Sequence, residues 1–138
     1  MNPIIRNIMA VVGGVAIGSL VNMGLIMLSP SIIPPPEGID PTQVEDIKSV
    51  IHLFQPKHYI IPFLAHALGT LVGGFIAAKF SSTSHVVCAL IVGVYFLLGG
   101  IAANMMLGSP IWYWIVDVTF AYIPMAFIGA RLASKPIT

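Results

Sequence analysis

The chain has 138 residues, of which 57% are hydrophobic and 8% are charged, and its mean hydropathy is +0.96. This composition is typical of an integral membrane protein and excludes an ordinary soluble domain. The formal net charge of +1 leaves no extended basic patch, so we expect the lipid bilayer, and not nucleic acid, as a partner. Cys88 is the single cysteine, which excludes an intrachain disulfide.

The apolar residues fall into four runs of membrane-spanning length. A helix needs about 20 such residues to cross a hydrocarbon core of about 30 Å, whereas a barrel strand needs roughly ten. We place the spans near residues 4–28, 58–79, 85–107 and 110–132. The sequence therefore predicts an all-α fold, an integral membrane four-helix bundle that forms a single transmembrane domain over residues 1–138.

The first run follows Arg6, as the apolar core of a signal peptide would follow a basic residue. It continues for about 22 residues to Ser29, longer than the 7 to 15 residues of a signal core. No clear small-x-small cleavage site precedes Ser29. We therefore expect this run to be a true span.

The loop of residues 29–57 begins with "SPSIIPPPEGIDP", whose three consecutive prolines favour a stiff, extended segment. Asp40, Pro41 and Gln43 then have the pattern of an N-cap, a first-turn proline and a capping-box partner. We expect a short amphipathic helix from about residue 41 to 54. Its apolar face carries Val44, Ile47, Ile51 and Phe54. This helix either closes the outer end of the bundle or acts as a movable lid over a site.

The other two connections are tight turns. "KFSSTSH" joins the second and third spans, and in "LGSP" Gly108 suits a helix end, Ser109 an N-cap and Pro110 a first helical position. The second, third and fourth spans should therefore be antiparallel neighbours. Pro124 lies inside the fourth span and removes a backbone hydrogen bond, so we expect a kink there.

The charged residues predict an orientation. One side of the membrane carries only basic residues, namely Arg6, Lys79, Arg131 and Lys135. The opposite side carries both signs, with Glu37, Asp40, Glu45, Asp46, Lys48 and Lys57. The positive-inside rule then places both termini in the cytoplasm, as expected in a bacterial inner membrane, and the loop helix outside. An aromatic belt should mark the outer interface, formed by Tyr59, Trp112, Tyr113 and Trp114.

Small residues recur at helical spacing in the first three spans. Helices in lipid associate through such faces because the hydrophobic effect gives little drive there. The expected packing glycines are Gly14, Gly18, Gly69, Gly73, Gly93 and Gly100. These faces serve contacts within one chain or between copies of it.

Polar residues continue the same faces. Asn22 lies four residues after Gly18, Asn104 lies four after Gly100, His66 adjoins Ala65, and Asp117 lies four before Ala121. All four residues lie roughly 7 to 12 Å from the outer ends of their spans, at 1.5 Å per residue. The sequence therefore predicts one polar layer to which each span contributes a member, with Thr70 one turn below His66.

Asp117 is the most informative member of this layer. An ionised carboxylate at mid-helix costs about 2.5 to 3.5 kcal/mol on insertion scales. Asp117 should therefore be protonated, paired with a protonated His66, or wetted by a cavity.

Several interpretations of the layer stay open. Its members either hydrogen-bond across helices and fix their register, or bind or relay a proton, a cation or a polar solute. A catalytic site is less favoured because only Ser19 and Thr70 offer hydroxyls near His66. A metal site is also less favoured, since zinc takes three or four protein ligands and His66 with Asp117 supplies two. We therefore expect no catalytic residues, no metal and no cofactor.

Two functions follow from these interpretations. The first is a non-catalytic packing or accessory subunit of a membrane assembly, and the alternative is a small transporter or channel that works as a homo-oligomer. The chain lacks the first-span glutamate of small multidrug exporters and the paired cysteines of quinone-linked disulfide oxidoreductases. We identify no characterised family from its motifs.

Overall fold

A computed structural model describes residues 1–36 and 38–134. These residues form helices and no strand. The elements in chain order are α1 (Pro3–Ile32), α2 (Val44–Val50), the 3₁₀ helices η1 (Ile51–Leu53) and η2 (Pro56–Tyr59), α3 (Ile60–Phe80), α4 (His85–Leu107), α5 (Ile111–Phe120) and α6 (Ile123–Ser134). Four stretches are long and apolar enough to cross a membrane: Pro3–Ile32, Pro56–Phe80, His85–Leu107 and Ile111–Ser134. The prediction of an all-helical chain with four membrane-length helices is confirmed.

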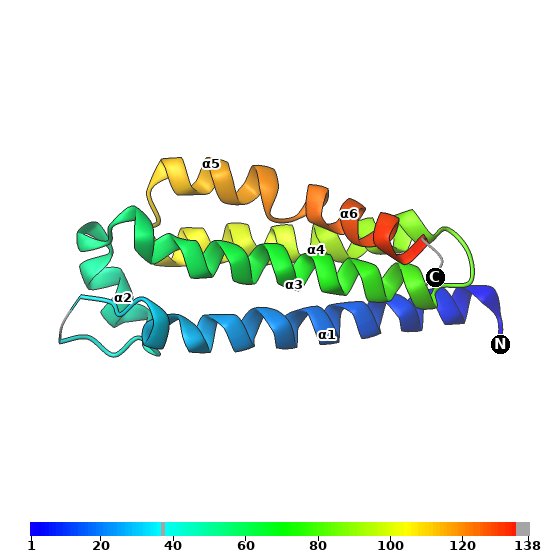
Figure 1. Ribbon diagram of the computed structural model, residues 1–138, viewed down its shortest axis with the longest axis horizontal. Coiled ribbons are helices and arrows are strands. Elements are labelled where there is room, and N and C mark those ends of the chain that lie inside the picture. Colours follow the sequence, from blue (N-terminus) through cyan, green and yellow to red (C-terminus); the bar gives the residue numbers. More distant parts are fainter. Residues whose placement is uncertain (37, 135–138) are drawn as a thin grey trace.

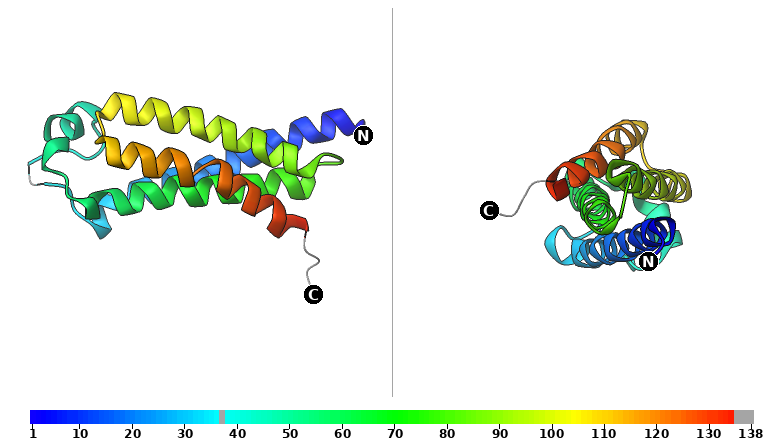
Figure 2. Two further views of the ribbon diagram at one scale, coloured as in Figure 1. Left: turned by 90° about the horizontal axis from the view of Figure 1, so that it is seen from above. Right: turned by 90° about the vertical axis from the view of Figure 1, so that its right-hand side faces the viewer.

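The long helices lie side by side in one elongated bundle (Figures 1 and 2). The start of α1, the end of α6 and the 81–84 turn lie together at what we call the terminal end. Residues 33–36 and 38–59 and the 108–110 turn lie at the opposite end, the loop end. Glu37 and Lys135, two of the residues used to predict the orientation, lie outside the described residues.

The contact between α1 and α3 brings two backbones together. A Cβ added at Gly14 would lie 2.5 Å from the carbonyl oxygen of Gly73, and one at Gly18 would lie 2.6 Å from that of Gly69. By contrast, a Cβ at Gly13 would meet nothing within 4 Å. The glycines on this face therefore allow the close backbone approach that packing in lipid requires.

The second half of the fourth span packs in the same way. A Cβ at Gly93 of α4 would lie 2.8 Å from the Cβ of Ala126 in α6, and one at Gly74 of α3 would lie 3.0 Å from the Ala126 backbone. Gly129 of α6 lies against the backbone of α3 at Leu71. Small residues thus close the bundle toward its terminal end.

The fourth span is interrupted. α5 ends at Phe120 and α6 begins at Ile123, so Ala121 and Tyr122 form a break between them. Pro124 is the second residue of α6, where the missing N–H is tolerated because first-turn amides lack partners within the helix. The chain changes direction just before the proline.

The N-terminal cap of the helix in the loop differs from the prediction. α2 begins at Val44 after Gln43, which makes no side-chain cap hydrogen bond. Asp40 instead accepts hydrogen bonds from the backbone N–H of Thr42 at 2.9 Å and from its hydroxyl at 2.6 Å. This local turn competes with the predicted capping box, because an aspartate side chain can bond its own downstream backbone. The regular helix is therefore shorter than residues 41–54.

The 108–110 turn and the aromatic residues beside it also need correction. Gly108 ends α4 in the left-handed region at φ 68°, as predicted, but Pro110 and not Ser109 is the N-cap of α5. Tyr59 and Tyr113 are buried, with ring centroids 4.6 Å apart. They pack η2 against α5 and do not form an exposed belt, whereas Trp112 is 43% exposed.

Candidate functional site

Asp117 lies at the centre of a buried polar cluster. Its side chain is fully buried, and its Oδ2 accepts hydrogen bonds from the Tyr122 hydroxyl at 2.7 Å and from Asn104 Nδ2 at 3.0 Å. Its Oδ1 lies 2.8 Å from His66 Nδ1 and receives a long contact of 3.5 Å from the Tyr113 hydroxyl. We call these five residues the Asp117 cluster. It joins α3, α4, α5 and the break before α6.

Both short contacts of His66 are made by one ring nitrogen, Nδ1. Tyr122 gives its hydroxyl proton to Asp117, and its oxygen lies 2.9 Å from His66 Nδ1. If Nδ1 were bare, its lone pair would face the lone pairs of that oxygen. A proton on Nδ1 satisfies both short contacts, because it is then shared between Asp117 and Tyr122. Asp117 is consequently surrounded by donors, the environment that suits an acceptor-only carboxylate.

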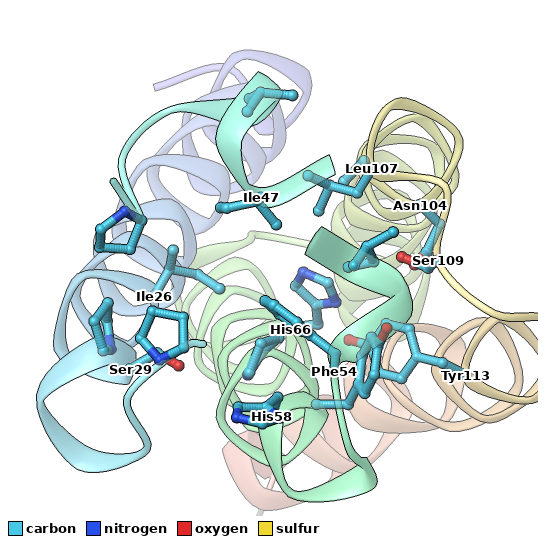
Figure 3. A pocket seen from close by; sticks show the side chains of 18 of the residues that line it. Ile26, Ser29, Ile47, Phe54, His58, His66, Asn104, Leu107, Ser109 and Tyr113 are labelled. Carbon is cyan, nitrogen blue, oxygen red and sulfur yellow. The ribbon is translucent and has the colours of Figure 1, made fainter. Parts of the chain in front are cut away.

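A cavity of about 430 Å³ lies at the loop end, next to the cluster. Figure 3 shows His66 near the middle of its lining, with Ile47, Phe54 and Asn104 around it. His66, Asn104 and Tyr113 belong both to the cavity wall and to the Asp117 cluster. The buried carboxylate is therefore separated from the cavity by the side chains that hold it.

His66 connects the two environments through its two ring nitrogens. Nδ1 faces Asp117 and Tyr122, while Nε2 has no hydrogen-bond partner among the described residues. The side chain of His66 is 16% exposed, in contrast to the fully buried Asp117. An occupant of the cavity can therefore bind Nε2 without disturbing the contact between His66 and Asp117.

The loop segment supplies the apolar cover of the cavity. The residues predicted to share one face of the loop helix all line it: Val44, Ile47, Ile51 and Phe54. His58 also lines the cavity and fixes this cover, since its Nδ1 accepts from the Gln55 N–H at 2.8 Å and its Nε2 lies 3.2 Å from the Pro34 carbonyl oxygen. One tautomer, with the proton on Nε2, satisfies both contacts.

The remaining predicted members of the layer lie outside the cluster. Asn22 of α1 lines the cavity, but its Oδ1 is buried without a hydrogen-bond partner in the described part of the chain. Thr70 is fully buried and donates to the backbone carbonyl of His66 at 2.8 Å. Of the four predicted layer residues, His66 and Asn104 thus contact Asp117 directly. Asn22 lines the same cavity as His66 and Asn104.

Two tyrosines of the cluster were not assigned to the site from the sequence. Tyr113 precedes Asp117 by four residues, so helical spacing alone places it on the same face. Tyr122 follows Asp117 by five residues, which in an unbroken helix points about 140° away. The break at residues 121–122 turns its hydroxyl back onto Asp117, and only the exact position of that break would have revealed it.

No group of three or more histidine, cysteine, aspartate or glutamate residues in the described chain is placed to hold a metal ion. The Thr70 hydroxyl donates a hydrogen bond to the backbone carbonyl of His66.

No protein family, curated protein or solved structure matches the chain in the comparisons.

Proposed function

We propose that this chain is a small membrane carrier that binds a solute in the loop-end cavity, with the Asp117 cluster as the polar end of the site. The observation that carries this proposal is the position of His66. One ring nitrogen contacts the buried Asp117 at 2.8 Å, and the side chain also lines the cavity. The site is thus an intramembrane ionisable pair in contact with a space large enough for a small molecule.

A purely structural layer would leave fewer polar atoms unused. Interhelical hydrogen bonds in lipid stabilise a bundle by pairing donors with acceptors across a closed interface. Here the Asn22 oxygen is unpaired, and His66 Nε2 has no partner among residues 1–36 and 38–134. Both residues line the same cavity, and this supports binding over packing alone.

The packing supports a carrier and not an open pore. Beyond the cluster, toward the terminal end, α1, α3, α4 and α6 meet through glycine and alanine. Transport therefore requires a change of conformation. The break at Ala121 and Tyr122 adjoins the cluster and gives the fourth span a place to bend. The Asp117 and His66 pair can couple that change to proton uptake, because the two ionisable side chains lie 2.8 Å apart.

Uptake by reconstituted vesicles tests this function while the solute is still unidentified. Liposomes that contain the purified protein are given a ¹³C-labelled small-molecule extract of the cells that make it, and the retained compounds are identified by mass spectrometry. We expect one compound class to accumulate relative to empty liposomes. Asp117→Asn should reduce this accumulation at least tenfold, because Asn keeps the shape of the site but cannot hold the charge. The matched control is Glu45→Gln, which removes an exposed carboxyl group in α2.

The accessory-subunit function stays a prediction that a second measurement addresses. Native mass spectrometry of the protein, released gently from its own membrane, should recover it without stoichiometric foreign subunits, as a single chain or a homo-oligomer. Foreign subunits in fixed ratio, together with full activity of that assembly in Asp117→Asn, would favour the accessory function and contradict the carrier.

We further propose that the terminal end faces the cytoplasm of a bacterial inner membrane. Arg6, Lys79 and Arg131 support this orientation, because cytoplasmic loops are enriched in basic residues. A green fluorescent protein fused to the C-terminus should be fluorescent, and an alkaline phosphatase fused there should be inactive. The opposite pair of results would reverse the orientation.

A further inference from the structure

We infer that His58 makes the cover of the loop-end cavity sensitive to pH, because it holds the cover closed while its imidazole is neutral and releases it when protonated. The cover is the segment of residues 41–54, which supplies Val44, Ile47, Ile51 and Phe54 to the cavity wall. The inference rests on the proposed function, since it concerns access to the same cavity. It follows from the hydrogen bonds of His58, which require one protonation state.

His58 joins the two ends of the chain segment that contains the cover. Its Nε2 lies 3.2 Å from the carbonyl oxygen of Pro34, which precedes the cover, and its Nδ1 lies 2.8 Å from the backbone nitrogen of Gln55, which follows it. Its ring packs against that of Phe54 with 5.0 Å between the centroids, and both side chains line the cavity (Figure 3). The cover is therefore tied at both ends through one side chain.

The two partners of His58 fix the position of its proton. A backbone N–H can only donate, so the contact with Gln55 requires a lone pair on Nδ1. A carbonyl oxygen can only accept, so the contact with Pro34 requires the proton on Nε2. The neutral imidazole with its proton on Nε2 makes both hydrogen bonds. The imidazolium has a proton on each nitrogen and cannot accept from Gln55.

Protonation of His58 therefore opposes the closed cover. A second proton, on Nδ1, would set two donors 2.8 Å apart. The ring then has to turn away from Gln55, and Nε2 moves with it because both nitrogens belong to one ring. In the open cover Nδ1 faces water and takes the proton without this loss. The open form consequently binds the proton more tightly than the closed form, so a fall in pH through the histidine range of about pH 8 to 5 favours opening.

The charged groups around His58 do not offset this loss. The titratable or charged side chains of its own element and of those around it are Lys57 and Tyr59 of η2, His52 of η1, His66 of α3, Tyr113 of α5, and Glu45, Asp46 and Lys48 of α2. Among residues 1–36 and 38–134, the ion pair that forms is that of His66 with Asp117, and no carboxylate pairs with His58. No described carboxylate therefore stabilises the imidazolium in the closed cover.

Hydrogen exchange of the Gln55 amide measures the contact directly. The exchange rate is determined in detergent micelles at about pH 8 and about pH 5, and is expressed as a protection factor to remove the intrinsic pH dependence of exchange. We expect the protection factor of the wild-type protein to be about tenfold smaller at the lower pH, because the side-chain acceptor of this amide is lost. His52→Phe, at an exposed histidine of the same cover, is the control and should show the same decrease.

A substitution that keeps the acceptor separates the titration of His58 from other effects of pH. His58→Asn places an amide oxygen near the position of Nδ1, where it accepts from the Gln55 N–H but takes up no proton. Its protection factor should stay high and equal at both pH values. His58→Phe keeps an aromatic ring beside Phe54 but offers no acceptor, so its protection factor should be low and equal at both pH values.

Movement of the cover is measured between two spin labels. Lys48→Cys in α2 and Met105→Cys in α4, both at exposed positions, are combined with Cys88→Ala and labelled. Because α2 packs against α4, the distance between the labels increases when the cover opens. Double electron-electron resonance should show a longer-distance population that grows roughly tenfold from about pH 8 to about pH 5. His58→Asn should abolish this growth.

The outcomes separate this inference from the proposed function. Equal protection of Gln55 at both pH values in the wild-type protein would overturn the inference. A decrease that persists in His58→Asn would also overturn it, because another group would then be responsible, and so would label distances that do not change with pH. None of these results affects uptake from the labelled extract at a single pH, which tests the carrier function by itself. Failed uptake would in turn leave the pH response of the cover intact.

Discussion

The position of the Tyr122 side chain depends on a glycine, Gly100 of α4. Its hydroxyl lies directly against Gly100 of α4, where an added Cβ would overlap the phenol oxygen. From this position Tyr122 contacts both Asp117 and His66. Gly100 therefore serves the polar cluster, beyond the general helix packing predicted for it.

Gly100→Ala should displace Tyr122 and loosen the cluster. Overpacking of a filled core costs about 1 to 3 kcal/mol in the free energy of unfolding. Gly99→Ala is the matched control, since an added Cβ there meets nothing within 4 Å. It should be neutral, or stabilising by about 0.5 to 1 kcal/mol, because alanine is the better helix former. Equilibrium unfolding of both variants in mixed micelles measures the difference, and equal stability of the two would contradict this role of Gly100.

The polar residues that sequence periodicity can identify are those on unbroken helices. His66, Asn104 and Asp117 were grouped from helical spacing and depth, and the structure brings them within hydrogen-bond distance. Asn22 had the same pattern, but it faces the cavity without a bond to the cluster. Depth along a helix cannot separate these cases, because it does not say how close two helices approach at a given level.

At the scale of the element, composition predicts the four long helices, but it predicts the positions of their ends less accurately. The third span was expected at 85–107 and α4 occupies His85–Leu107. The first helix runs through Pro30 to Ile32, beyond the expected end near residue 28, because the Ile33 N–H still bonds the Ser29 carbonyl at 2.9 Å. The break in the fourth span precedes Pro124 by two residues. Proline predicts that a helix is disturbed but not which residue leaves the helical conformation.

The cover of the cavity should loosen when His58 loses its two contacts. His58→Phe removes the acceptor for the Gln55 N–H and the donor to the Pro34 carbonyl. We expect hydrogen exchange of the Gln55 amide to become at least tenfold faster, because its side-chain partner is lost. His52→Phe, at an exposed histidine of η1, is the control and should leave that rate unchanged. Unchanged protection in His58→Phe would show that the apolar face of α2 and η1 holds the cover by itself.

At the scale of the whole molecule, the bundle has two unlike halves. Toward the terminal end the helices meet through glycine and alanine, and toward the loop end they separate around a cavity. The sequence indicated the small-residue faces, but it offered a cavity only as one of three possible surroundings of Asp117, because a void depends on how far helices diverge and on what covers their ends. The account therefore depends on one claim, that His66 and its neighbours line a space that a solute enters.

Cysteine accessibility tests that claim most directly. Ala103 of α4 lines the cavity, whereas the adjacent Ala102 lies on the exposed surface of the same helix. Each is replaced by cysteine in a Cys88→Ala background, and the reconstituted protein is treated with the uncharged, water-soluble reagent 2-hydroxyethyl methanethiosulfonate, which reacts with ionised thiols, and thiols ionise in water and not in lipid. We predict that Ala103→Cys is labelled at least tenfold faster than Ala102→Cys. Equal, slow labelling of both positions would show that no solute-accessible cavity reaches His66 and would contradict the account.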